Sequence, residues 1–137
     1  MLFRAAGADG EKEMTSEAWP SEIRLVEGGK ALDVAFEDGA RHRFAAEHLR
    51  VRSPSAEVQG HSPTDRVTLG GKRGVAILDV APVGNYAVRL DFDDGHTTGI
   101  FTWRFFRDLG PRLAADFAAY ERELAEKGLD RDRPGEG

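Results

Sequence analysis

Two short segments of alternating apolar and polar residues, each ending in an Asp-Gly pair, constrain the fold of this chain most strongly. They are residues 34–39 and 90–95 of the sequence. Alternation with a period of two is typical of a β-strand with one buried face, and Asp-Gly supplies the positive φ that tight hairpin turns need. Either an ancient duplication or convergence on a common hairpin sequence explains the likeness. Both explanations predict antiparallel hairpins.

The flanking sequence extends each hairpin into a group of strands. In the first half we predict strands at 23–26, 31–36 and 41–44, joined by Gly28-Gly29 and by the turn at 37–40. In the second half, residues 74–80 form a nearly continuous apolar run, which predicts a central strand covered on both faces. After a Gly84-Asn85 turn, Tyr86 is expected to share one face with Val88, Leu90 and Phe92, and a last strand is expected at 96–101.

Helices are predicted between and after these strands. Residues 45–50 favour one or two helical turns, a further helix is expected to start at Ser53-Pro54, and 61–74 is expected to be a surface loop. Thr102 is a good N-cap for a helix over 103–109, which Gly110-Pro111 interrupts. A second helix then carries one apolar stripe and ends near Gly128; the stripe consists of Leu113, Phe117, Tyr120 and Leu124. The stripe either covers the sheet or pairs with a second copy of the chain, so the oligomeric state stays open.

The predicted fold class is therefore α+β. We expect an antiparallel sheet of about six short strands built from hairpins, with short helices and a C-terminal amphipathic helix on one side. The expected organisation is a flexible leader at 1–18, a domain at 19–109, a C-terminal helix at 110–128 and a flexible tail at 129–137.

The composition limits which cellular compartments and which classes of partner fit this chain. The sequence has 137 residues and no cysteine, which fits one domain in a reducing cytoplasm and excludes thiolate metal sites. It shows neither a signal peptide nor an apolar run long enough to cross a membrane. A net charge of −5 argues against general binding of nucleic acid. Residues 41–73 carry a local excess of +4, either as a solvated loop or as a face for an acidic partner.

His96 is the first candidate for chemistry, because it directly follows the Asp93-Asp94-Gly95 turn. It is a metal ligand, an acid/base oriented by Asp94, or a structural histidine that stabilises the turn by hydrogen bonds. The other histidines lack the spacing of a zinc site, and the glycines around Lys72 lack the pattern of a phosphate-binding loop. The aromatic residues around Trp103 are expected in the core, or, if Trp103 is exposed, as an anchor for a partner.

Several short motifs together resemble the gamma-butyrobetaine hydroxylase-like N-terminal domain family. The resemblance runs from about Trp19 to Leu109 and rests on Trp19-Pro20, Phe36–Gly39, Leu49-Arg50, Ser53–Glu57, Pro82–Tyr86 and Asp94–Gly99 leading to Trp103. In that family the domain precedes iron- and 2-oxoglutarate-dependent oxygenase domains, is appended to P-loop ATPases that carry iron–sulfur clusters, or stands alone. The stand-alone form is the expectation here, without the oxygenase domain.

The resemblance also bears on metal binding. The hydroxylase version binds zinc through three cysteines and the histidine of the Asp-Gly-His turn. Here His96 is present, but the cysteine positions fall on Ser53, Ser55 and Val58. Serine hydroxyls are weak, neutral ligands for zinc. No cofactor is therefore expected, and zinc or iron at His96 remains the alternative.

These observations favour a non-catalytic accessory or binding domain over an enzyme. The resemblance links it to iron–sulfur cluster assembly or transfer, with an iron–sulfur carrier as the protein partner. The candidate contact residues are Lys72, Arg73, Gly84, Asn85, Tyr86 and Trp103. Two alternatives stay open: an accessory or relic domain that supports a separate 2-oxoglutarate/iron-dependent oxygenase, and a divergent metal-binding domain centred on His96.

Overall fold

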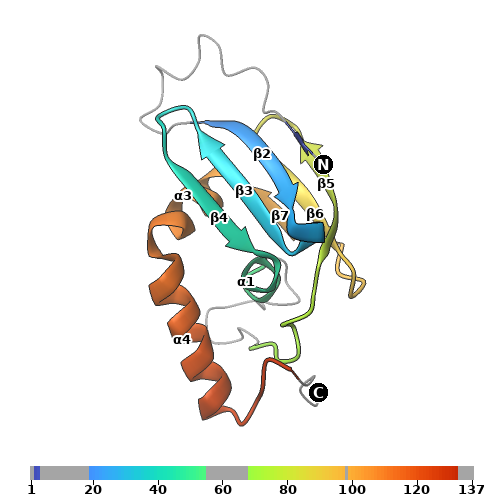
Figure 1. The fold of residues 1–137 in the computed structure, drawn as a ribbon, viewed down its shortest axis with the longest axis vertical. Helices are drawn as coiled ribbons and strands as arrows, with labels where there is room; N and C mark the ends of the chain where they lie inside the picture. Colours follow the sequence, from blue (N-terminus) through green and yellow to red (C-terminus); the bar gives the residue numbers. More distant parts are fainter. Residues whose placement is uncertain (1, 4–18, 55–67, 98, 133–137) are drawn as a thin grey trace.

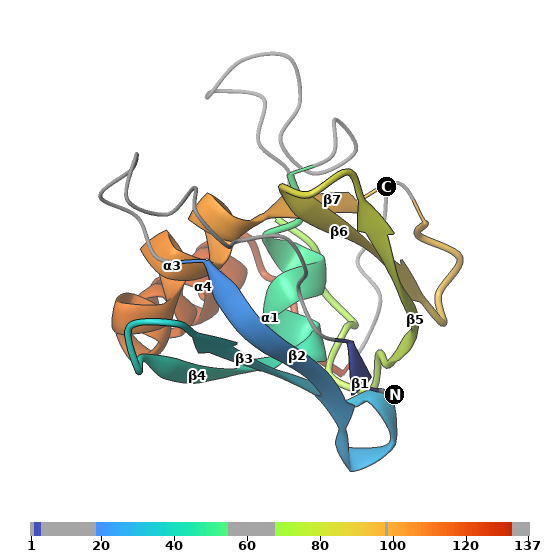
Figure 2. The ribbon, with the colours of Figure 1, turned by 90° about the horizontal axis from the view of Figure 1, so that it is seen from above.

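The chain folds into two antiparallel sheets that share one hydrophobic core (Figures 1 and 2). The structure is a computed structural model, and it describes residues 2–3, 19–54, 68–97 and 99–132. The first sheet has the order β1 (Leu2–Phe3), β2 (Pro20–Val26), β3 (Ala31–Phe36) and β4 (Arg41–Ala45). The second has the order β5 (Ile77–Val83), β6 (Ala87–Phe92) and β7 (Gly99–Thr102).

Short helices connect and cover these sheets. Helix α1 (Ala46–Val51) directly follows β4 and lies between the two sheets in Figure 2. Helix α3 (Trp103–Leu109) follows β7, and the 3₁₀ turn η4 (Gly110–Arg112) links it to α4 (Leu113–Glu126). As predicted, the Thr102 hydroxyl caps α3 by accepting a hydrogen bond from the Phe105 N–H at 3.1 Å. Gly128, with a φ of 69°, ends α4 as predicted.

The register of the strands explains the core. Alternate residues of the first sheet face inward, so that Leu25, Leu32 and Phe44 lie side by side across three strands. Val88, Leu90 and Phe92 of β6 supply the opposite wall. The 3₁₀ turn η2 (Glu27–Gly29) joins β2 to β3 and touches the second sheet, because a Cβ on Gly29 would lie 2.4 Å from the Ile77 carbonyl oxygen. This close approach requires glycine.

The predicted α+β class and the predicted hairpins are confirmed, but the strands divide between two sheets instead of forming one. The strands of each half of the chain pair with one another, and the two resulting sheets pack against each other. Alternation along a strand shows that one face is buried and does not show which strand covers it. Strand β1, inside the expected leader, pairs with β2 through Leu2↔Arg24 and Phe3↔Ile23 and was not predicted.

The prediction of a central strand at 74–80 is wrong. Strand β5 begins only at Ile77 and lies at the edge of the second sheet. The register with β6 shifts between Ile77 and Asp79, and at this bulge Leu78 is 64% exposed. A bulge in an edge strand turns a side chain away from the core, so an apolar run alone does not identify a central strand.

The predicted placement of Tyr86 on the inward face of β6 is also wrong. Strand β6 begins one residue later, and Tyr86 belongs to the turn after β5, where it is 51% exposed. The stripe on α4 covers the sheets only in part, because of its four residues only Leu113 packs against the core that the sheets share. Tyr120 and Leu124 pack against Val51 of α1, with Phe117 beside them.

Two sequence predictions fall partly beyond the described structure. The expected helix at 53–58 and the expected loop at 61–74 extend over residues 55–67, which lie outside the described residues. The same holds for most of the leader and for 133–137. No helix in the described ranges is long and apolar enough to cross a membrane.

Candidate functional site

The candidate residues lie in two groups at opposite ends of strand β6. The turn after β6 brings together Asp94, His96 and Lys72, whereas the turn before β6 holds Asn85 and Tyr86. Six residues of extended strand span about 20 Å. The structure therefore does not join the basic loop at Lys72 to the turn at Tyr86 in one surface.

Asp94 is the centre of the first group. Its Oδ1 accepts a hydrogen bond from the His96 backbone N–H at 3.1 Å, and its Oδ2 accepts bonds from Arg50 Nε at 2.8 Å and Lys72 Nζ at 2.5 Å. Burial alone raises the pKa of Asp94, but the hydrogen bonds from Lys72, the His96 backbone and Arg50 outweigh it and lower the pKa to about 2. Asp94 is therefore ionised at neutral pH and supports the turn as a carboxylate.

His96 is buried, and its ring is held by a hydroxyl group. His96 Nε2 lies 3.0 Å from Ser53 Oγ, and both side chains are almost fully inaccessible to solvent. The His96 carbonyl accepts a hydrogen bond from the Phe92 N–H at 2.9 Å, which closes the turn. The absence of a side chain at Gly99 leaves room for the Ser53 hydroxyl, since a Cβ on Gly99 would lie 2.7 Å from Ser53 Oγ. These contacts are those of the structural, turn-stabilising histidine that the sequence offered as one interpretation.

The described residues do not fit the zinc site of the hydroxylase version. The ring nitrogen of His96 faces a neutral hydroxyl, a weak ligand, where a thiolate would be needed. In the described ranges, no three His, Asp or Glu side chains lie close enough together to hold a metal ion. Ser55 and Val58, the two other positions implied by the resemblance, lie outside the described residues.

The basic loop is bound to the C-terminal segment. Lys72 donates to Asp94, as above, and Arg73 forms an ion pair with Asp132 at 2.5 Å. The Gly71 N–H bonds the Asp130 carbonyl at 2.8 Å, and the Arg73 N–H bonds the Arg131 carbonyl at 3.0 Å. The charge of Lys72 is thus paired with Asp94 at the surface, while Arg73 keeps half of its side-chain surface in solvent.

The second group forms a rigid turn with one exposed aromatic ring. Trp103 is 9% exposed, and its Nε1 donates to the Asn85 carbonyl at 2.9 Å, while its backbone N–H donates to the Tyr86 carbonyl at 3.1 Å. Gly84 has a φ of 53°, and a Cβ there would lie 3.1 Å from the Tyr86 ring. Trp103 therefore belongs to the core, as the first interpretation had it, and fixes the turn that exposes Tyr86.

A further charged cluster, between α1 and α4, was missed by the sequence analysis. Asp116 Oδ2 lies 2.7 Å from His48 Nε2 and 2.9 Å from Arg52 Nε. Burial lowers the pKa of His48 although Asp116 opposes this, and hydrogen bonds from His48 and Arg52 lower the pKa of Asp116 against the effect of its burial. The signal was the spacing of His48 and Arg52, four residues apart on one helical face, which indicates a shared partner.

The second end of this cluster is formed by Arg131. Its guanidinium binds the buried Glu47 carboxylate with two hydrogen bonds of 2.6 and 2.7 Å. It also stacks over the Phe117 ring at 5.0 Å. Paired charges therefore attach helix α4 and the residues after it to α1, beside the apolar contact of Tyr120 and Leu124 with Val51, so this cluster has a structural role.

The fold and these contacts define a small α+β domain whose interior charges stabilise turns and helices and whose rigid β5–β6 turn exposes an aromatic side chain. The family model described as gamma-butyrobetaine hydroxylase-like, N-terminal, matches residues 23–107, and the chain belongs to this family. A search among curated proteins found no match.

Solved structures agree with this assignment. An NMR solution structure is 43% identical, with 88% of this chain and 94% of that chain covered and a TM-score of 0.72. A second NMR structure is 34% identical, with coverages of 89% and 91% and a TM-score of 0.74. A crystal structure of a DUF971-family protein from Acidithiobacillus ferrooxidans is 42% identical, with coverages of 66% and 91% and a TM-score of 0.54. The chain thus spans nearly the whole length of each of these proteins.

Proposed function

We propose that this chain is a non-catalytic accessory domain that binds a protein partner through the turn Gly84–Tyr86. The observation that carries the proposal is the half-exposed Tyr86 ring on a backbone that Trp103 fixes with two hydrogen bonds. Aromatic side chains on rigid supports are typical binding hot spots, since little conformational entropy is lost when they are buried.

The internal charges support a binding role over a catalytic one. Asp94 is neutralised by Arg50 and Lys72, and His96 is bonded to Ser53 away from solvent. A general acid or base must be able to reach its substrate. Asp94 and His96 are instead occupied by contacts within the protein. Arg73, which pairs with Asp132 but keeps half of its side chain in solvent, is a second candidate contact for the partner at this end.

The partner class that we propose is an iron–sulfur cluster carrier of the P-loop ATPase type, in the cytoplasm. The support for it is the family itself, in which this domain is appended to such ATPases. The family description also names a hydroxylase, which supports a second candidate partner, a separately encoded 2-oxoglutarate/iron-dependent oxygenase. Both partners would use the same exposed turn.

The test is a tagged pull-down from the native host under anaerobic conditions, followed by mass spectrometry. We expect the wild-type chain to enrich a P-loop cluster carrier and Tyr86→Ser to lose at least ten-fold of this enrichment, as hot-spot truncations do. Leu78→Ser is the matched control, because Leu78 is also a large, exposed hydrophobic side chain (64% exposed) but lies on the bulge of β5. Enrichment of an oxygenase would select the second candidate, and recovery of the bait alone would refute both.

A further inference from the structure

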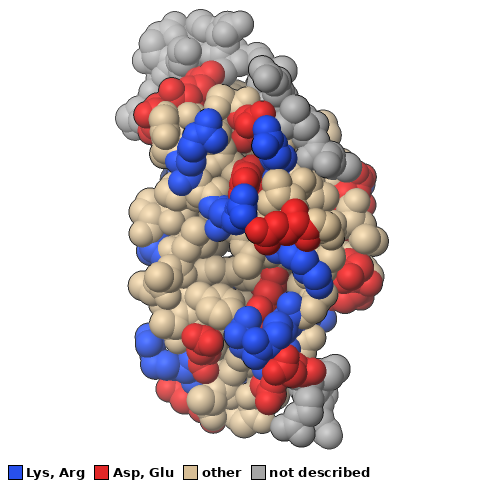
Figure 3. Space-filling view, viewed as in Figure 1, with Lys and Arg blue, Asp and Glu red and all other residues tan. Residues whose placement is uncertain are grey.

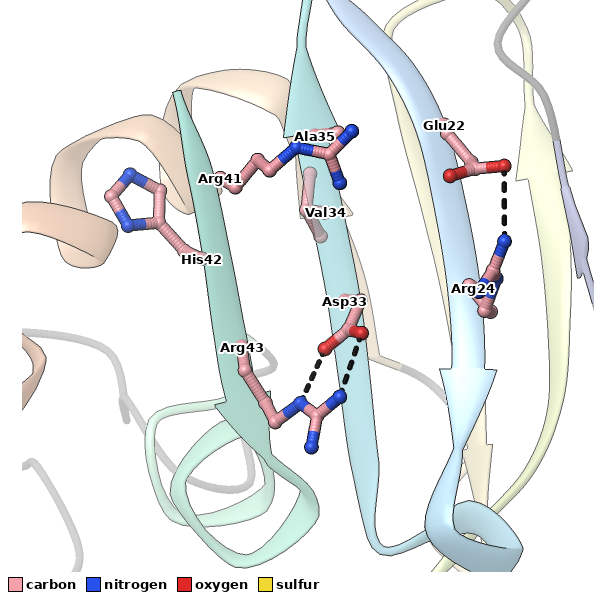
Figure 4. A pocket seen from close by; sticks show the side chains of 8 residues that line it. All are labelled: Glu22, Arg24, Asp33, Val34, Ala35, Arg41, His42 and Arg43. Atoms are coloured by element: carbon pink, nitrogen blue, oxygen red, sulfur yellow. Dashed lines mark hydrogen bonds and ion pairs between the residues drawn. The ribbon is translucent and has the colours of Figure 1, made fainter. Parts of the chain in front are cut away.

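The outer face of the first sheet contains a hollow that the function proposed above does not use. Its volume is about 430 Å³, within the range of small-molecule sites. Figure 4 shows it between β2, β3 and β4. The side chains that define it are Glu22, Arg24, Asp33, Ala35, Arg41 and Arg43. In Figure 3, which shows this side of the molecule, basic and acidic side chains are interleaved over the sheet.

Strand register places these side chains in two rows. Arg24, Asp33 and Arg43 are direct neighbours across the three strands and form the first row. The second row is Glu22, Ala35 and Arg41. Successive residues of a strand point to opposite faces, so both rows project outward. The methyl group of Ala35, in the middle of the second row, thus forms the floor of the hollow. The residue in the middle of the first row is Asp33, a carboxylate.

Two members of the first row, Asp33 and Arg43, bind each other. Arg43 donates to Asp33 Oδ1 from Nε at 2.7 Å and to Asp33 Oδ2 from Nη2 at 3.0 Å. Its remaining Nη1 donates to Glu27 at 2.7 Å. Each of the three guanidinium nitrogens of Arg43 therefore donates a hydrogen bond, and both carboxylate oxygens of Asp33 accept one.

Arg24 of the first row and Arg41 of the second row keep donors for a ligand. Arg24 has one loose ion pair, with Glu22 at 3.6 Å. No hydrogen bond or ion pair joins Arg41 to another group in the described part of the chain, and Figure 4 shows its guanidinium reaching over Ala35. Each guanidinium carries five N–H donors in a planar fork, which matches the two oxygens of a carboxylate.

The local potential also favours an anion. The hydrogen bond from Arg43 is the main reason why the pKa of Asp33 is lowered; burial opposes it, and the charges of Arg43, Arg24 and Arg41 add to it. Three guanidinium groups thus act on one place, in a chain whose net charge is −5. Glu22 and Asp33 balance two of the three charges, and Glu27 also pairs with Arg43 from outside the hollow. The positive charge available to a ligand is therefore mainly that of Arg41, which suits a singly charged anion better than a phosphate dianion.

We propose that the hollow above Ala35 is a carboxylate-binding site, in which Arg41 and Arg24 donate to the two oxygens of the ligand. This site lies on a different sheet from the Tyr86 turn and is independent of the function proposed above. The carboxylate belongs to a free small monocarboxylate or to an acidic side chain of a peptide, because both present the same group.

The test is an NMR titration that follows the Arg Nε–Hε signals at constant ionic strength. Propionate is added to about 50 mM, well above the millimolar dissociation constant that a site with few contacts provides. We expect a saturable shift at Arg41 and Arg24 and none with propionamide, its neutral analogue. Arg89, which is exposed and paired with Asp91 on the second sheet, is the internal control and should not shift.

Two variants address the site from opposite sides. Arg41→Gln removes the donor and should weaken binding at least five-fold, while Ala35→Leu adds three carbon atoms to the floor of the hollow, leaves every arginine in place and should weaken binding to a similar extent. Unchanged backbone spectra verify that both fold. A linear shift, an equal shift at Arg89, or wild-type affinity of Ala35→Leu would overturn the proposal.

The same titration with the peptide acetyl-Ala-Glu-Ala-amide identifies the source of the carboxylate. Tighter saturation by the peptide than by propionate assigns the site to an acidic protein segment. Equal or weaker saturation assigns it to a free small carboxylate. Absence of saturation by both probes would overturn the carboxylate site itself and would leave the Tyr86 proposal unaffected.

Discussion

Replacing Asp94 by asparagine should destabilise the protein in a way that depends on pH. Asparagine keeps an oxygen for the His96 N–H, so the turn persists, but it removes the charge that receives hydrogen bonds from Arg50 and Lys72. The prediction therefore isolates the electrostatic contribution of one carboxylate at the start of the β6–β7 turn.

The magnitude follows from the pKa of Asp94. A change from the ordinary 3.8 to about 2 corresponds to at most about 2.5 kcal/mol, at about 1.4 kcal/mol for each pH unit. Asp94 is 20% exposed, and solvent screening reduces this to about 1–2 kcal/mol. Because the folded carboxylate titrates below the unfolded one, its contribution is complete above about pH 5 and is lost as the pH falls toward 2.

Urea unfolding followed by tryptophan fluorescence measures this contribution, since the Trp103 ring is buried in the folded state. At about pH 7 we expect Asp94→Asn to lower the free energy of unfolding by about 1–2 kcal/mol, and at about pH 2.5 by less than half of that. A difference of equal size at both pH values would refute the electrostatic reasoning.

The first hairpin offers a matched control. Asp38 occupies the same place in its Asp-Gly turn, and its Oδ1 accepts a hydrogen bond from the Ala40 N–H at 3.0 Å. In the described part of the chain no arginine or lysine pairs with it. Asp38→Asn should therefore change the free energy of unfolding by less than about 0.5 kcal/mol at either pH, as is usual for surface substitutions.

Three further predictions concern the interior. Gly99→Ala should lower the free energy of unfolding by about 1–3 kcal/mol in thermal or urea unfolding, because its Cβ would lie 2.7 Å from Ser53 Oγ. Burial lowers the pKa of His48 below its ordinary 6.5, so the wild-type chain should lose stability as the pH falls below about 6.5, and His48→Gln should lose less in unfolding curves at pH 7.5 and 5.5. Elemental analysis of protein from zinc-supplemented cultures should give the same zinc content for the wild type and His96→Ala, far below one ion per chain; a wild-type content near one that falls in the variant would restore the metal-binding alternative.

The local structure of this protein could be predicted from its sequence to a large extent. The strand at residues 31–36 and the helix at 103–109 agree with the structure, because alternation, Asp-Gly turns and a Thr N-cap act within a few residues. The same local rules indicated that His96 stabilises its own turn.

Long-range partners could not be predicted in this way. The separation into two sheets depends on close approaches such as that between Gly29 and Ile77, which are 48 positions apart. The exposure of Leu78 depends on a bulge that no local pattern marks. Half of the residues of helix α1 are polar or charged, and their burial depends on partners far away in the sequence, such as the pair of His48 and Asp116, 68 positions apart.

The candidate site, too, could be predicted only as far as local sequence determines it. The sequence proposed Tyr86 as a contact residue, but its exposure follows from Trp103, which binds the turn from a distant helix. The sequence also proposed Lys72 as a contact residue in a basic loop, and in the structure its ammonium group forms an ion pair with Asp94.

The central claim, that the Tyr86 turn binds an iron–sulfur cluster carrier, is tested most directly by titration of the purified chain with the host's P-loop cluster carrier under anaerobic conditions. We predict a dissociation constant of about 1–10 µM for the wild type and for Leu78→Ser, and a value at least ten-fold higher for Tyr86→Ser. Absence of binding at about 100 µM carrier, or equal affinities of the wild type and Tyr86→Ser, would contradict the claim.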